Sequence, residues 1–182
     1  MDKRGAIWVS AVLYMALGII IISMVLAAGL PAVQKLKDRY TLVQTKDLML
    51  TLDENIRTVF HEGPGSQRVV KLKIDRGVLE INTFDSNNIQ ESNNILWTFS
   101  TPVLISEPDK SIEEGNLQIL TSTTAIENSY DVELKLYYED TIALVYDDGS
   151  TASGTINLVI LNEGSRPFGD DGERIKINLE KI

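Results

Sequence analysis

Residues 6–34 read AIWVSAVLYMALGIIIISMVLAAGLPAVQ. The stretch contains no Asp, Glu, Lys, Arg or His, and its centre is almost continuously apolar. An uninterrupted apolar run of about 18 residues or more is typical of a membrane-spanning helix. At about 1.5 Å per residue, residues 6–30 would extend roughly 37 Å as a helix, which is enough for a hydrocarbon core of roughly 30 Å with some tilt. The sequence therefore predicts a transmembrane helix over residues 6–30.

Two other interpretations of this stretch fit the chain less well. A buried core helix needs a large domain around it, and the remaining chain is small and strand-like. A cleaved secretory signal has an apolar region of only about 7–15 residues. Leu26-Ala27-Ala28 loosely matches its cleavage pattern, but the chain beyond continues as an apparent helix. We therefore expect an anchor that stays attached.

Charge is distributed unevenly along the 182 residues, which leave room for one modest domain and an anchor. Residues 1–39 carry five basic and two acidic side chains, a net charge of +3, and residues 40–182 carry 12 and 24, a net charge of −12. The distal domain should therefore repel nucleic acid and anionic lipid head groups. Lys3 and Arg4 favour a cytoplasmic N-terminus, although three basic residues, Lys35, Lys37 and Arg39, also follow the apolar run.

The helical pattern continues beyond Pro31, where we expect a kink because proline removes one backbone donor. Apolar residues recur three and four apart in two runs within residues 31–62, with a polar interval at residues 44–47 between them. This pattern indicates an amphipathic stalk helix ending before the breaker at 63–66. We predict one stripe comprising Val33, Leu36, Tyr40, Val43, Leu48, Leu52, Ile56 and Val59. Its last four residues are the candidates for stalk packing. They pack either against the protein's own sheet or against a neighbouring helix.

From Gln67 onward the apolar period changes to two, which is typical of strands. Residues 66–182 contain about eight short alternating segments. We expect a hairpin loop at Asp75-Arg76-Gly77 with Gly77 in the left-handed conformation, a further strand at Val103-Leu104-Ile105, and a break at Asn162-Glu163-Gly164. The spacing favours an antiparallel β-sandwich or a strongly bent sheet. The predicted fold class is therefore α+β, and the absence of helical patterns between the strands argues against an α/β enzyme.

Residues suited to catalysis or metal binding are few. The sequence has no Cys, its one His is His61, and it contains no glycine-rich phosphate loop. The pairs Asp147-Asp148 and Asp170-Asp171, each followed by Gly, offer hard oxygen ligands, but they lack the spacing of a calcium loop and are also ordinary turn sequences. We expect no enzyme activity, no cofactor and no metal. These residues leave a membrane-tethered domain that binds a ligand or partner as one function class.

The order of these features resembles that of archaeal type IV pilin-like proteins. Lys3-Arg4-Gly5 form a short basic leader, followed by the charge-free helix from Ala6, the amphipathic continuation and an acidic β domain. The stretches 53–81 and 156–177 are also similar in pattern to small archaeal pilin-like membrane proteins.

The resemblance implies a class III signal peptide, cut by a prepilin-type peptidase between Gly5 and Ala6. Residues 1–5 would be the leader, and the mature helix would assemble with other pilin-like subunits into a cell-surface filament. The expected assembly residues are Ser10, Leu17, Ile21 and Val25. The N-terminus would be cytoplasmic before processing, with the β domain outside the cell. One departure is Ser10, because many pilins carry Glu at the fifth mature position.

Overall fold

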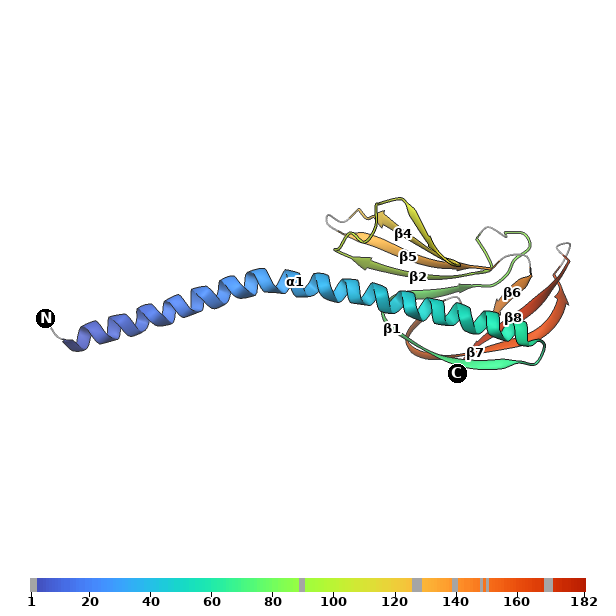
Figure 1. Ribbon diagram of the computed structural model, residues 1–182, viewed down its shortest axis with the longest axis horizontal. Helices are drawn as coiled ribbons and strands as arrows, with labels where there is room; N and C mark the ends of the chain where they lie inside the picture. Colours follow the sequence, from blue (N-terminus) through green and yellow to red (C-terminus); the bar gives the residue numbers. More distant parts are fainter. Residues whose placement is uncertain are drawn as a thin grey trace. The chain divides into compact units, whose positions relative to one another are not determined.

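The described residues form one long helix followed by eight strands, which confirms the α+β class (Figure 1). The computed structural model describes residues 3–88, 91–125, 129–138, 141–147, 149, 151–168 and 172–182, with side chains described from Trp8 onward. Helix α1 spans Lys3–Glu62 and continues through Pro31. The strands are β1 (Gln67–Asn82), β2 (Asn94–Thr101), β3 (Ser111–Glu114), β4 (Leu117–Thr123), β5 (Tyr130–Tyr137), β6 (Ile142–Tyr146), β7 (Thr151–Pro167) and β8 (Glu173–Lys181).

The chain divides into two compact units, Met1–Asp38 and Arg39–Ile182. The first consists of the N-terminal part of α1. The second contains the remainder of α1 and all the described strands, and we call it the head domain. This boundary falls earlier in the sequence than the one expected at residue 66, because the last turns of α1 belong to the same core as the strands.

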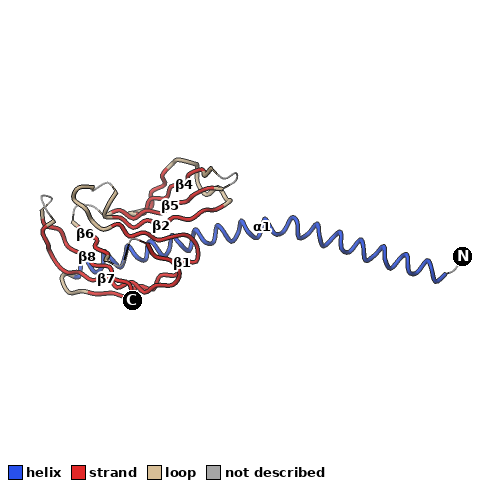
Figure 2. The backbone as a smooth tube through the Cα atoms, turned by 180° about the vertical axis from the view of Figure 1, so that it is seen from behind, coloured by secondary structure: helices blue, strands red, loops and turns tan. Residues whose placement is uncertain are grey.

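The described strands of the head domain form a single hydrogen-bonded sheet with the strand order β3-β4-β5-β2-β1-β7-β8-β6. It is one sheet and not two stacked sheets, so the bent sheet is the correct alternative. Neighbouring strands are antiparallel except β6 and β8, which are parallel. Figures 1 and 2 show β2, β4 and β5 on one side of the C-terminal part of α1 and β7 on the other, so the sheet curves around this part of the helix.

The core lies between the curved sheet and the inner face of α1. Leu52, Ile56 and Val59 are fully buried there, so three of the four predicted stalk residues belong to the core that the helix shares with the sheet. Leu48 is only half-buried, and Met49 takes the inner position instead. The strands contribute alternate residues to this core, as the period of two predicts.

The first four residues of the predicted stripe are exposed and lie outside this core. Val33, Leu36, Tyr40 and Val43 are exposed by 63%, 68%, 69% and 54% respectively. The reason is helical geometry, because the separation between positions 43 and 52 corresponds to about 2.5 turns, which places the two residues on opposite sides of a helix. The prediction of one continuous stripe is therefore wrong. The helix carries two apolar faces, and the head domain buries only one.

Two glycine positions interpreted as chain breaks are irregularities within long strands. β1 continues through Gly77, and its pairing with β7 shifts register between Ile74 and Leu79. Gly77 has the expected positive φ, 86°, but a Cβ at this position would lie 2.2 Å from the carbonyl oxygen of Thr98. Gly77 therefore allows close approach of β2 and a bulge, and the predicted hairpin loop is wrong.

The second such irregularity lies in β7, which shifts register against β8 between Asn162 and Gly164. The predicted break there is also wrong. Two smaller corrections concern neighbouring segments: residues 103–105 form no strand, and the short exposed strand β3 was not predicted.

Candidate membrane and assembly helix

The exposed surface of the N-terminal unit is the most distinctive feature of the chain. Between Trp8 and Leu30 the large apolar side chains are 52–75% exposed. Within the part of the chain that the structure describes, this helix is long and apolar enough to cross a membrane. No part of the described chain buries its most apolar window. A contiguous exposed apolar surface of this kind is unfavourable in water.

The four predicted assembly residues share one side of this helix. Leu17, Ile21 and Val25 follow one another at intervals of four, and Ser10 precedes Leu17 by seven residues, so all four fall within about a quarter of the helix circumference. Leu17, Ile21 and Val25 are 52%, 53% and 64% exposed, and Ser10 is also exposed. The side chains are therefore positioned to contact a neighbouring surface.

The predicted processing residues lie at the beginning of α1. Gly5 and Ala6 have helical backbone, but their side chains lie outside those the structure describes. Cleavage between them stays a prediction.

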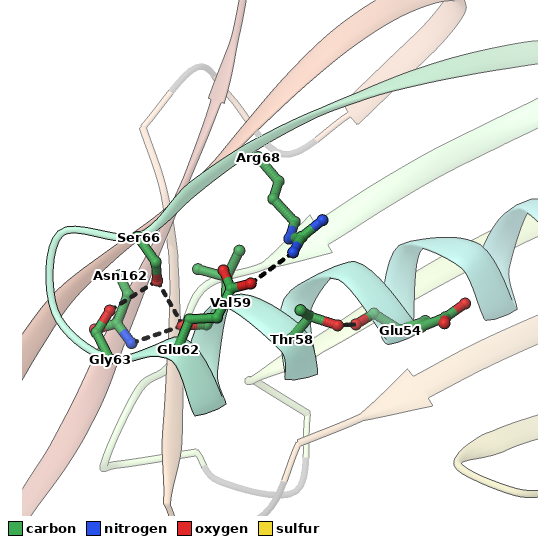
Figure 3. A network of polar contacts seen from close by, with 8 residues as sticks. All are labelled: Glu54, Thr58, Val59, Glu62, Gly63, Ser66, Arg68 and Asn162. Carbon is green, nitrogen blue, oxygen red and sulfur yellow. Dashed lines mark hydrogen bonds and ion pairs between the residues drawn. The ribbon is translucent and has the colours of Figure 1, made fainter.

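The end of α1 is fixed to β7 by a polar cap (Figure 3). Gly63, at φ 92°, follows the last helical residue, which is a common way for a helix to end. Asn162 donates from Nδ2 to the carbonyl oxygen of Val59 at 3.0 Å. The hydroxyl of Ser66 lies 2.7 Å from the same oxygen and 2.7 Å from the carbonyl oxygen of Gly63. The cap thus satisfies carbonyl groups that a helix C-terminus leaves without intrahelical partners.

Backbone bonds reinforce this junction. The amide of Gly65 donates to the Asn162 carbonyl oxygen at 2.8 Å, and the Asn162 amide donates to the Ser66 carbonyl oxygen at 3.0 Å. Asn162 Oδ1 accepts from the Gly164 amide at 2.8 Å. Asn162 is buried, and sequence reasoning assigned it only to a break. Its pairing depends on residues about 100 positions away, so no local signal identifies it.

A second polar cluster joins α1 to the β3–β4 end of the sheet. Asp53 accepts from Arg57 Nε at 2.9 Å and from Asn116 Nδ2 at 3.2 Å. Tyr138 is buried beside them, and the Arg57 guanidinium lies 5.9 Å from its ring centroid. Burial raises the pKa of the Tyr138 hydroxyl well above its ordinary value, the negative charge of Asp53 raises it further, and Arg57 lowers it. This hydroxyl therefore stays protonated, which suits a structural role.

β6 lies at one end of the strand order, and side chains form hydrogen bonds along its outer edge. Asn93, in the left-handed conformation at φ 56°, donates from Nδ2 to the carbonyl oxygen of Ile142 at 2.8 Å and accepts from the Leu144 amide at 2.9 Å. Thr83 Oγ1 accepts from the Tyr146 amide at 3.1 Å. These bonds occupy backbone groups that would otherwise be open to another strand.

A pocket of about 540 Å³ adjoins this closed edge. Its lining includes three carboxylates, Asp85, Glu91 and Asp147, together with the amides of Asn82 and Asn88. Among the described residues, no group of three or more acidic, His or Cys side chains is placed to hold a metal ion. Several of the polar groups bond one another, as when Asn88 Nδ2 donates to Glu91 Oε2 at 3.0 Å.

The remaining chemical candidates have simple surroundings. His61 is exposed and contacts the ring of Phe60 edge-on, with centroids 5.1 Å apart. Of the two Asp-Asp pairs considered as metal ligands, Asp148, Asp170 and Asp171 lie outside the described residues.

Comparison of the chain with protein-family models, with curated proteins and with solved structures found no match. The chain itself combines an exposed apolar helix with a folded acidic domain.

Proposed function

We propose that this protein is a pilin-like structural subunit of an archaeal type IV pilus-like cell-surface filament, assembled through its hydrophobic N-terminal helix. The observation that carries the proposal is the exposed, charge-free surface of α1 between Trp8 and Leu30, joined to a head domain with its own core. A subunit of this kind needs both parts. The helix associates with lipid before assembly and with other pilin-like subunits afterward, and the head forms the outer surface.

The basic leader explains why membrane placement, cleavage and assembly would follow one another in that order. Lys3 and Arg4 hold the N-terminus at the cytoplasmic face of the bilayer. Cleavage by a prepilin-type peptidase between Gly5 and Ala6 removes both charges. The shortened helix then leaves the bilayer more easily, and association of apolar helices is favourable because burying one Leu or Ile side chain contributes roughly 1.5–3 kcal/mol.

Ser10 stands at the position where a Glu would offer a carboxylate to the new amine of Ala6 in a neighbouring subunit. Assembly of this chain therefore relies on apolar contacts at Leu17, Ile21 and Val25. This favours a minor subunit within a filament.

The mass of the protein isolated from its native membrane tests the proposal. We expect a chain that begins at Ala6 and is present in a sheared filament fraction. Gly5→Val should block processing and leave the full-length chain in the membrane, whereas Asp2→Asn, a leader change away from the cut, should be processed normally. Only full-length protein in native cells, with none in filaments, would contradict the proposal.

The second candidate is a single-pass membrane protein whose β domain binds a ligand outside the cell. The pocket beside Asp85 and Asp147 favours it, since three carboxylates and two amides line one cavity. The two candidates differ in the fate of the leader: a permanent tether keeps residues 1–5, and a filament subunit loses them.

A further inference from the structure

The first half of β1 is an edge strand, although β1 stands between β2 and β7 in the strand order. β1 pairs with β7 through residues 67–74, whereas β2 pairs only with residues 78–82. Among the strands that the structure describes, none besides β7 pairs with residues 67–74. We call the unpaired side of residues 67–74 the open edge of β1. It lies entirely within the head domain.

Two hydrogen bonds of β7 show in which direction the backbone of β1 points. In an antiparallel pair, alternate residues direct both their amide and their carbonyl toward the same neighbouring strand. The Asn162 amide donates to the Ser66 carbonyl oxygen at 3.0 Å, so the even-numbered residues in this part of β7 point toward β1. The Asn157 carbonyl oxygen accepts from the Ile182 amide at 3.0 Å, so the odd-numbered residues point away from β1.

The register then identifies the backbone groups on the open edge. Val69, Lys71 and Lys73 lie opposite odd-numbered residues of β7, so they have no ladder bond to that strand. Their amides and carbonyls point outward along the open edge. The residues between them, Val70 and Leu72, bond to β7 and place their side chains in the core.

The same three residues also present their side chains to solvent. Val69 is 58% exposed, and Lys71 and Lys73 are exposed. Lys73 forms an ion pair with Asp75 at 3.0 Å, whereas the described residues place no carboxylate within ion-pair distance of Lys71. The open edge is therefore basic, although residues 40–182 carry a net charge of −12.

The other edges of the sheet differ from this one. Side chains of Asn93 and Thr83 occupy backbone groups of β6, as described above. β3, at the opposite end of the strand order, is only four residues long and includes Glu113 and Glu114. A long edge with unpaired backbone groups is a template for an additional strand.

The two lysines indicate which strand fits the open edge. Residues directly opposite each other in a ladder share one face of the sheet, and like charges in such pairs are destabilising. Pairing with the same edge of a second copy would bring Lys71 and Lys73 near lysines. A strand with acidic residues at alternate positions would instead place a carboxylate opposite each lysine.

We propose that the open edge of β1 binds an extended acidic segment of another protein, which adds one strand to the sheet. Main-chain hydrogen bonds to Val69, Lys71 and Lys73 hold the segment, and the two lysines select Asp or Glu at alternate positions. The inference goes beyond the proposed function. It requires neither cleavage of the leader nor a filament, so the processing test above and the binding tests below can fail independently.

Hydrogen exchange tests the backbone geometry directly. The probe is a synthetic peptide of about eight residues, the length of the open edge, in which Glu alternates with Thr. Full-length, isotope-labelled protein in micelles of a neutral detergent would be followed by nuclear magnetic resonance. Without peptide, the amides of Val69, Lys71 and Lys73 should exchange several-fold faster than those of Val70 and Leu72.

The peptide should then slow exchange at the three edge amides several-fold. Exchange at Val70 and Leu72 should change little, because their amides already bond to β7. Equal exchange at odd and even positions without peptide would overturn the proposed geometry. Unchanged exchange at the edge amides, at the highest soluble peptide concentration, would overturn the proposed binding.

Altered peptides separate strand addition from attraction between charges. Fluorescence anisotropy of a labelled peptide would measure its affinity for the full-length protein in the same micelles. A peptide with Lys in place of Glu should bind several-fold more weakly. A Glu-Thr peptide methylated at alternate backbone nitrogens keeps its charge but loses the donors of one edge. With the methyl groups on the edge that faces β1, it should also bind several-fold more weakly. Undiminished binding of either altered peptide would overturn the proposal.

Variants of the protein locate the binding site. Lys71→Glu should weaken peptide binding several-fold. Lys135→Glu, the matched control, makes the same charge change on β5, which has β2 on one side and β4 on the other. It should leave the affinity within about two-fold, because at about 0.15 M ionic strength charges more than about 8 Å apart are largely screened. Equal weakening by the two variants would overturn the proposal.

Val69→Pro removes one edge amide and no bond to β7, since proline is tolerated in an edge strand where its nitrogen faces solvent. It should abolish most of the binding while far-ultraviolet circular dichroism stays unchanged. Full binding by a folded Val69→Pro protein would contradict the proposal. The methylated peptide tests the same contact in the unmodified protein, so the proposal is tested even where this variant does not fold.

Discussion

Asn162 donates a hydrogen bond from its side-chain amide to the carbonyl oxygen of Val59, 3.0 Å away, and so joins the middle of β7 to the last turn of α1. Its own Oδ1 accepts from the Gly164 amide within the β7 irregularity. One buried side chain therefore satisfies groups on two elements that lie about 100 residues apart in the sequence. The junction determines where the helix ends relative to the sheet, within the head domain.

Replacing this amide should destabilise the head domain. Asn162→Ala leaves the carbonyl of Val59 and the amide of Gly164 with fewer buried partners, and leaving such groups unsatisfied costs about 1–3 kcal/mol. The full-length protein in detergent should show this loss in its denaturant midpoint, followed by near-ultraviolet circular dichroism. Asn157→Ala, at an exposed position of the same strand, is the control and should change stability by less than about 0.5 kcal/mol. Equal effects of the two variants would mean that the cap adds nothing to stability.

The two apolar faces of α1 should respond differently to truncation. Ile56→Ala removes a fully buried side chain and should cost about 2–5 kcal/mol. Val43→Ala removes a side chain that is 54% exposed and should shift the unfolding free energy of the monomer by less than about 0.5 kcal/mol. A denaturant titration of both variants at low protein concentration checks this. A large cost at Val43 would mean that this side chain is buried in the monomer and that the exposed position described above is wrong.

A side chain at Gly77 should clash with β2, whereas a side chain at Gly115 should not. Gly77 and Gly115 both have positive φ, 86° and 62°, so both disfavour alanine through backbone strain. Only at Gly77 would a Cβ contact the Thr98 carbonyl oxygen, at 2.2 Å, and nothing lies within 4 Å of a Cβ at Gly115. Gly77→Ala should therefore lower the thermal midpoint of the head domain more than Gly115→Ala does. The prediction fails if the two substitutions shift the midpoint equally.

Tyr138 should make the head domain sensitive to high pH. Its pKa is raised by burial and by Asp53, so the folded state holds the proton more tightly than the unfolded state does. The resulting stability is present below the unfolded pKa of about 10 and is lost progressively as the pH rises above it. Tyr138→Phe should reduce the loss of stability between neutral and strongly alkaline pH. Tyr40→Phe, at an exposed tyrosine, should leave the alkaline profile as it is in the unmodified protein.

Much of the architecture is encoded locally and could be predicted from the sequence. The charge-free run at 6–34 specifies an apolar helix whatever the rest of the chain does, because no residue in it carries a charge that needs water. Alternation at positions such as Leu134 and Leu136 specifies strands with one buried face. Even the left-handed conformation of Gly77 follows from its residue type and neighbours.

Contacts between distant segments were not predictable in this way. A glycine with positive φ fits a hairpin or a bulge equally well, and only the approach of Thr98 from β2 makes Gly77 a bulge. The parallel pairing of β6 with β8 likewise depends on strand order, which a period of two does not encode. Asn162 gains its role only when β7 lies beside the end of α1.

The same distinction holds for residues 31–62 of α1. The sequence by itself determined that residues 31–62 carry two runs of apolar residues spaced three and four apart, with a polar interval between them. Only the tertiary structure decided which of them are covered, since burial depends on where the sheet curves around the helix and a helical repeat is the same on every side. The head domain covers Leu52, Ile56 and Val59, and Tyr40 and Val43 are left exposed because half-integral turns separate the two sets.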